Sequence, residues 1–111
     1  MAINPKIIVF TSILQMGKSI ISSENHFYLE SKEDDADYIT RLKRIIESIK
    51  KELTELGLTQ VEANALCLEL REFAKTLFMK TWMQGIDEFE DKTEVWSEGS
   101  EEFESIYEFY Q

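Results

Sequence analysis

The sequence predicts an all-α protein: a four-helix bundle built on a long antiparallel helical hairpin, with an acidic C-terminal helix. Its 111 residues suit a single domain. The chain has only four glycines and one proline, a composition that favours long helices with few turns. Two apolar stripes with alternating steps of three and four residues follow each other across a short turn. They predict the hairpin over residues 31–84.

The first helix is expected over residues 5–22. Asn4 suits the N-cap, and Pro5 suits the first helical position because its missing N–H costs nothing there. Apolar side chains then recur at helical spacing on one side. They are Val9, Phe10, Ile13, Met16, Gly17 and Ile20.

The stretch "SSENHFYLES" that follows shows no helical period, so we expect a loop. Phe27 and Leu29 are expected to anchor this loop to the core. His26 has no second histidine and no cysteine nearby, which favours a solvated loop residue over a metal ligand or a nucleophile.

The second helix is expected over residues 32–56. The spacing of Ser31 and Asp34 resembles a capping arrangement at its start, and Gly57 marks its end. Its core stripe comprises Ile39, Leu42, Ile46, Ile49, Leu53 and Leu56. Basic residues on this helix alternate with acids, which is typical of a solvated face, although they could also receive an acidic tail. These basic residues are Arg41, Lys43, Arg44, Lys50 and Lys51.

The third helix is expected over residues 60–84, starting at a capping box formed by Thr59 and Glu62. Its core stripe comprises Ala63, Leu66, Leu70, Phe73 and Leu77. A second apolar set, which includes Val61, falls on the opposite side of this helix. One alternative function is therefore a structural helical subunit that forms a homodimer. The expected dimer residues are Leu68, Met79 and Met83.

The fourth helix is expected over residues 100–110, with Ser100 as its N-cap. This end of the chain holds most of the net charge of −10, because residues 86–111 contain ten acids against Lys92 alone. The same segment carries six of the 13 aromatic residues. The charge argues against direct binding to nucleic acid or to an anionic membrane and indicates a basic protein partner.

The sequence therefore predicts a small acidic regulator or inhibitor that occludes a positively charged surface, in the manner of a nucleic-acid mimic. The expected partner handles nucleic acid, as nucleases and transcription proteins do. In type the chain resembles phage and mobile-element inhibitors, antitoxins and immunity proteins. The candidate partner-binding residues are Trp96, Glu101, Glu102, Phe103, Glu104, Tyr107, Glu108 and Tyr110.

A nucleotide-binding interpretation begins with "SILQMGKS", residues 12–19, which matches the phosphate-binding loop G-x-x-x-x-G-K-[ST] except at Ser12. Such a loop needs glycines that let backbone N–H groups converge on phosphate. It also needs strands, and the rest of the sequence predicts none. We therefore expect a helix here, in which Gly17 allows close packing and Lys18 binds no phosphate.

A second enzymatic interpretation rests on "ELRE" and "EFED", which have the ExxE…ExxD form of the all-α nucleoside triphosphate pyrophosphatases. The resemblance implies that Glu69, Glu72, Glu88 and Asp91 hold magnesium, since hard cations prefer oxygen ligands. The pyrophosphatase pattern continues into an apolar helix, whereas "KTEVWSEGS" follows Asp91. We therefore expect no enzyme, no metal ion and no cofactor, and keep the pyrophosphatase as the alternative.

Cys67 is the only cysteine, so no intramolecular disulfide can form and a reducing compartment is favoured. Its apolar neighbours favour a buried, unreactive thiol. The apolar run over residues 7–21 contains Lys18 and is too short to span a bilayer. We expect a cytoplasmic protein.

Overall fold

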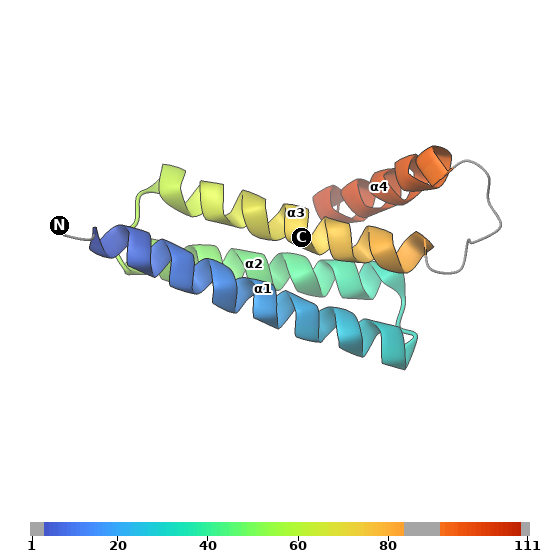
Figure 1. Cartoon of the computed structure of the whole chain (residues 1–111), viewed down its shortest axis with the longest axis horizontal. Helices are drawn as coiled ribbons and strands as arrows, with labels where there is room; N and C mark the ends of the chain where they lie inside the picture. The colour runs from blue at the N-terminus through green and yellow to red at the C-terminus, as the bar shows by residue number, and fades with distance from the viewer. Residues whose placement is uncertain (1–3, 84–91, 110–111) are drawn as a thin grey trace.

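The computed structural model describes residues 4–83 and 92–109, which form four helices and, within those ranges, no strand. The helices are α1 (Pro5–Ser31), α2 (Asp35–Glu55), α3 (Gln60–Met83) and α4 (Lys92–Phe109). They pack side by side as an elongated bundle (Figure 1). The prediction of an all-helical bundle is confirmed.

Helix α3 lies at the centre of the bundle and contacts α1, α2 and α4. Helix α4 packs on α2 and α3, and in the described part of the chain it makes no contact with α1 (Figure 1). The largest fully buried side chains come from α2, α3 and α4, and they are Tyr38, Phe78 and Phe103. Ile21 of α1 is fully buried in the same cluster, so one core joins all four helices.

Helix α1 continues to Ser31, so the loop expected after residue 22 is wrong. Asn25 occupies a buried position on its inner side, and its amide donates a hydrogen bond of 2.9 Å to the Tyr38 hydroxyl. The Tyr28 ring stacks on the Tyr38 ring with a centroid distance of 4.2 Å. Phe27, one of the two expected loop anchors, is instead 54% exposed, and the other, Leu29, is 41% exposed.

Arg41 of α2 holds the C-terminal half of α1 in place. Its Nε donates to Glu24 at 2.5 Å, and its two terminal nitrogens each donate to Glu33 at 2.6 Å. The hydrogen bonds to Glu33 are the main reason why the pKa of Arg41 is raised above its usual value. Such a paired guanidinium fork fixes both the spacing and the orientation of its carboxylate partners.

Helix α2 begins after Asp34 rather than near Ser31. The Asp34 carboxylate accepts a hydrogen bond of 2.7 Å from the backbone N–H of Ala36, as an N-cap side chain does. The predicted core stripe of α2 is buried except for Leu56, which caps the C-terminal end and is 61% exposed.

The turn between α2 and α3 forms as predicted. Gly57 adopts φ = 94°, a left-handed conformation that favours glycine. Backbone N–H groups of Thr59 and Glu62 each donate to the other residue's side chain, at 2.9 and 3.2 Å. The capping box is therefore confirmed, and these bonds are the main reason why the pKa of Glu62 is lowered.

The stretch of residues 12–19 lies within α1, so it does not form a phosphate-binding loop. A Cβ on Gly17 would lie 2.8 Å from Cδ2 of Leu70, which confirms that the glycine permits close packing of α1 on α3. The Lys18 ammonium lies 5.6 Å from the centroid of the Phe73 ring.

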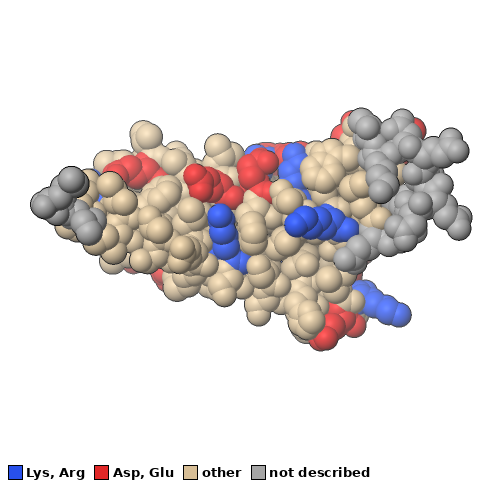
Figure 2. Space-filling model, viewed as in Figure 1, with Lys and Arg blue, Asp and Glu red and all other residues tan. Residues whose placement is uncertain are grey.

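Most of α1 carries no charge. Its Lys, Arg, Asp and Glu residues are limited to Lys6, Lys18, Glu24 and Glu30. Figure 2, in the same view as Figure 1, accordingly shows few acidic or basic side chains over α1. No helix in the described ranges combines the length and hydropathy needed to cross a membrane.

Candidate functional site

Helix α4 begins at Lys92, well before the predicted start at Ser100. Gly99 lies on its inner side, where a Cβ would be 2.7 Å from Cε of Met79 and 3.1 Å from Cγ of Trp82. The glycine therefore lets α4 approach α3 closely. A glycine at an inner position also interrupts the apolar pattern, which is why the sequence placed the start of the helix too late.

Phe103 is the main apolar anchor of α4. Its side chain is fully buried, and its ring centroid lies 5.8 Å from that of Phe78. Ile106 and Val95 of α4 are buried on the same side. Phe103 was predicted to bind a partner, but in the folded bundle it belongs to the core.

The residues predicted for a homodimer do not share one exposed face. Met79 is fully buried beneath α4, at the position where Gly99 approaches it. Met83 is half-buried, whereas Leu68 is 55% exposed. The second apolar side of α3 is therefore divided: α4 covers the part near Met79 and leaves Leu68 open.

Two of the predicted partner-binding acids are engaged within the chain. Glu104 forms ion pairs with Arg71 and with Lys75, the latter at 2.9 Å. Glu108 lies 3.0 Å from the same Arg71. Glu104 and Glu108 are four residues apart on α4, and Arg71 and Lys75 are four residues apart on α3. The two charges on each helix therefore lie on one face of it. That shared spacing was the signal available in the sequence, and it was missed for Arg71 and Lys75.

Tyr107 is held between two cations. Its ring centroid lies 5.2 Å from Nζ of Lys43 and 5.0 Å from the guanidinium of Arg71. Lys43 also donates a hydrogen bond of 2.6 Å to the Tyr107 carbonyl, so one basic residue of α2 does contact the acidic helix. Burial raises the pKa of Tyr107 to about 12. This predicted partner-binding residue therefore helps to dock α4.

The outer side of α4 carries four acids that are exposed to solvent. Glu94, Glu98, Glu101 and Glu102 are exposed, and their spacing of four, three and one residues places them on one side of the helix. We call these four residues the outer acidic face. Glu101 and Glu102 were predicted from the sequence, and the longer helix adds Glu94 and Glu98.

The remaining predicted aromatic residues are Trp96 and Tyr110. Trp96 is 43% exposed near the start of α4. Tyr110 lies outside the described residues. Trp96 is thus the aromatic side chain of the predicted set that a partner could reach in the described part of the chain.

The carboxylates of the pyrophosphatase alternative are only half described. Glu69 and Glu72 are exposed on α3 and border a shallow hollow with Lys18, while Glu88 and Asp91 lie outside the described residues. Within residues 4–83 and 92–109 there is no group of three or more histidines, cysteines or acids that could hold a metal ion. The magnesium site remains a prediction that the structure does not test.

Two further reactive side chains were considered in the sequence. Cys67 is half-buried, its thiol faces the Ile46 carbonyl at 3.7 Å, and burial raises its pKa. His26 lies on the exposed side of α1, with Nε2 3.0 Å from the Glu30 carboxylate. The raised pKa of Cys67 disfavours the reactive thiolate, and His26 and Glu30 are both exposed on one helix.

Comparison with protein-family models, curated proteins and solved structures found no match for this chain. Surface chemistry is therefore the basis on which a function can be proposed.

Proposed function

We propose that this chain is a protein-binding regulator or inhibitor that presents the outer acidic face of α4 to a positively charged surface and occludes it. The proposed partner is a basic protein that handles nucleic acid, such as a nuclease or a transcription protein. Proteins of this physical type include phage and mobile-element inhibitors, antitoxins and immunity proteins. A cytoplasmic location belongs to the same proposal.

The observation that supports this function is the fixed orientation of the outer acidic face. Phe103 is buried on the inner side of α4, and Glu104 is bound to Arg71 and Lys75 at the edge of the helix. Carboxylates on a helix held in this way are already arranged before a partner arrives. Preorganised groups lose less freedom on binding and so contribute more to affinity.

The arrangement of the charges also suits a surface that binds a phosphate backbone. Successive turns of a helix are separated by about 5.4 Å along its axis, so the acids of α4 form a linear array of negative charge. Complementary charge speeds encounter with a basic surface. Trp96 is 43% exposed on another side of the same helix and is of the residue type that often provides an interface anchor.

The proposal is tested by capturing partners from the native host with the tagged chain and identifying them by mass spectrometry. A parallel bait carries Glu98→Gln, Glu101→Gln and Glu102→Gln. The control bait carries Glu47→Gln, Glu55→Gln and Glu69→Gln, which removes the same charge from exposed acids of α2 and α3. We expect a basic nucleic-acid-binding protein with the native and control baits and a strongly reduced yield with the first variant.

The captured protein is then purified, and its binding to nucleic acid is measured with increasing amounts of the chain. Occlusion predicts competition that weakens as salt is added, because exposed charges are screened over a Debye length of about 8 Å at physiological ionic strength. Equal capture by both variant baits, or binding without competition, would refute the proposed function.

A further inference from the structure

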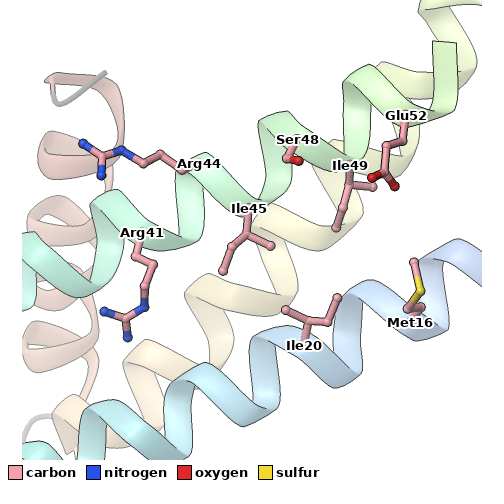
Figure 3. A pocket seen from close by; sticks show the side chains of 8 residues that line it. All are labelled: Met16, Ile20, Arg41, Arg44, Ile45, Ser48, Ile49 and Glu52. Atoms are coloured by element: carbon pink, nitrogen blue, oxygen red, sulfur yellow. The ribbon is translucent and has the colours of Figure 1, made fainter. Parts of the chain in front are cut away.

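A groove between α1 and α2 lies open to solvent (Figure 3). Its volume is about 580 Å³. Met16 and Ile20 border it from α1, and Ile45 and Ile49 border it from α2. Met16 is 47% exposed and Ile20 is 37% exposed. Apolar grooves between adjacent helices are the places where a further helix packs in bundles and in helix–protein complexes.

The groove between α2 and α3 of the same bundle is filled by a helix, namely α4. Helix α4 lies against α2 and α3 with Phe103 and Ile106 buried, and its Glu104 reaches Arg71 on α3. None of the described helices covers the α1–α2 groove, since α4 and α1 are not in contact. The α1–α2 groove is therefore apolar and uncovered within the described chain.

Opposite charges mark the two ends of the groove. Arg41 and Arg44 lie at one end and Glu52 at the other, with the isoleucines between them (Figure 3). A two-fold axis through the middle of the groove would set the arginine end of one molecule against the Glu52 end of a second. An isologous interface requires this kind of self-complementarity, because each patch must recognise itself.

The apolar side chains along one edge of α1 are also compatible with a two-fold axis. Val9, Met16, Ile20 and Phe27 follow one another at steps of seven, four and seven residues, which places them along one side of the helix. Positions 9 and 27, and positions 16 and 20, are equally far from position 18. Two antiparallel copies of α1 centred there would bring Val9 opposite Phe27 and Met16 opposite Ile20.

We propose that the α1–α2 groove is a self-association surface, at which a second copy of this chain docks antiparallel about a two-fold axis. Arg41 is already bound to Glu24 and Glu33, so the exposed Arg44 is the cation that faces Glu52 of the second copy. The net negative charge of the described residues is concentrated on α4, which lies on α2 and α3 and does not contact α1. Two copies that meet at the α1–α2 groove therefore repel each other less than their net charge suggests.

Sedimentation equilibrium over a range of protein concentrations tests the proposal. The native chain is expected to show a monomer–dimer equilibrium. Met16→Lys should raise the dissociation constant at least about tenfold, because it places a charge in an apolar contact near the two-fold axis. Leu68→Lys is the matched control, since it makes the same change at an exposed position on α3. It should leave the equilibrium unchanged.

The charged ends provide a second test. Glu52→Arg alone and Arg44→Glu alone should each weaken the dimer, whereas the double variant should restore it, because the two ends again carry opposite charges. Glu55→Arg, an exposed position of α2 outside the groove, should have no effect. Helix content and thermal melting establish that each variant is folded.

Three outcomes would overturn this assignment. The native chain could remain a monomer at every concentration. A dimer could be insensitive to Met16→Lys. A dimer could instead be disrupted by Leu68→Lys, which would place the interface on α3. None of these results depends on the acidic face of α4, so the test is independent of the proposed function.

Discussion

At the scale of single residues, Arg41 is the side chain that ties the C-terminal half of α1 to α2. Its guanidinium binds Glu24 and Glu33 and lies 5.3 Å from the centroid of the Phe27 ring. The side chain is 30% exposed, so these ion pairs are partly withdrawn from water. Removing the cation would leave two carboxylates close together without compensation. Truncating one member of such a group costs more than an exposed ion pair is worth.

We therefore expect Arg41→Met to lower the free energy of unfolding by about 2 kcal/mol. Lys51→Met is the control, because Lys51 is exposed on the same helix and does not line the α1–α2 groove, and surface substitutions of this kind usually change stability by less than about 0.5 kcal/mol. Chemical denaturation of both variants measures the difference. Equal stability of the two would show that the Arg41 ion pairs contribute nothing net.

The tyrosines make stability depend on alkaline pH. Burial raises the pKa of Tyr38 and of Tyr107 to about 12, and burial with a hydrogen bond to Asp35 raises that of Tyr28. Tyrosine in an unfolded chain ionises near pH 10. The folded state thus favours the protonated phenols. Their contribution is complete below about pH 10 and is lost as the pH rises from 10 through 12.

We expect helicity to stay constant up to about pH 10 and then to fall together with the appearance of phenolate absorbance. Circular dichroism and ultraviolet absorbance follow the two changes in a Tyr110→Phe background, which limits the phenolate signal to the three described tyrosines. Ionisation near pH 10 without loss of helix would contradict the raised pKa values.

At the scale of elements, α4 has an inner side that holds it to the bundle and an outer side that faces solvent. Phe103 is fully buried, whereas Trp96 is 43% exposed, although the sequence placed both in the same partner-binding set. A substitution at Phe103 therefore tests how α4 is held to the bundle, whereas a substitution at Trp96 tests recognition of a partner.

Phe103→Ala is expected to lower the free energy of unfolding by about 3–4 kcal/mol, because truncation of a buried phenylalanine leaves a cavity. Trp96→Ala should cost less than about 1 kcal/mol. Denaturation curves of the two variants provide the comparison. If Trp96→Ala proved as destabilising as Phe103→Ala, Trp96 could not be used to test partner binding separately from folding.

The middle of the bundle was the most predictable part, since α2 and α3 have regular apolar stripes and explicit capping residues. Helices α1 and α4 were both predicted too short, and for the same reason. Asn25 and Gly99 occupy inner positions where the pattern requires an apolar side chain. The Asn25 amide is buried there because it donates a hydrogen bond to the Tyr38 hydroxyl, and Gly99 is needed because Met79 leaves no room for a side chain. Both reasons depend on a neighbouring helix, which no local pattern reveals.

The candidate site was predictable to a similar extent. Composition located the acidic segment, and Glu101 and Glu102 are exposed as that prediction requires. The pairing of Glu104 and Glu108 with Arg71 depends on how α4 lies against α3. Long-range ion pairs of this kind follow from the packing of the helices, so sequence alone could not separate engaged acids from available ones.

At the scale of the whole molecule, the binding and enzymatic interpretations make opposite predictions about nucleotides. We expect no magnesium-dependent hydrolysis of nucleoside triphosphates by the purified chain, measured as release of pyrophosphate. Hydrolysis that is lost in Glu72→Gln would instead establish the pyrophosphatase interpretation. Lys18→Ala is a useful comparison, because Lys18 borders the same hollow as Glu72 without being a candidate ligand.

The position of α4 at one side of the bundle has a consequence for how the native state opens. Helix α3 is held by three neighbours, whereas α4 is held by α2 and α3 alone. Structural units with fewer packed neighbours open at lower free energy than the rest of a fold. Native-state hydrogen exchange should therefore reveal a partial opening in which α4 amides exchange while those of α3 stay protected. Such an opening would uncover Phe78 and Met79, so the helix proposed to recognise a partner also shields buried apolar side chains of its own bundle.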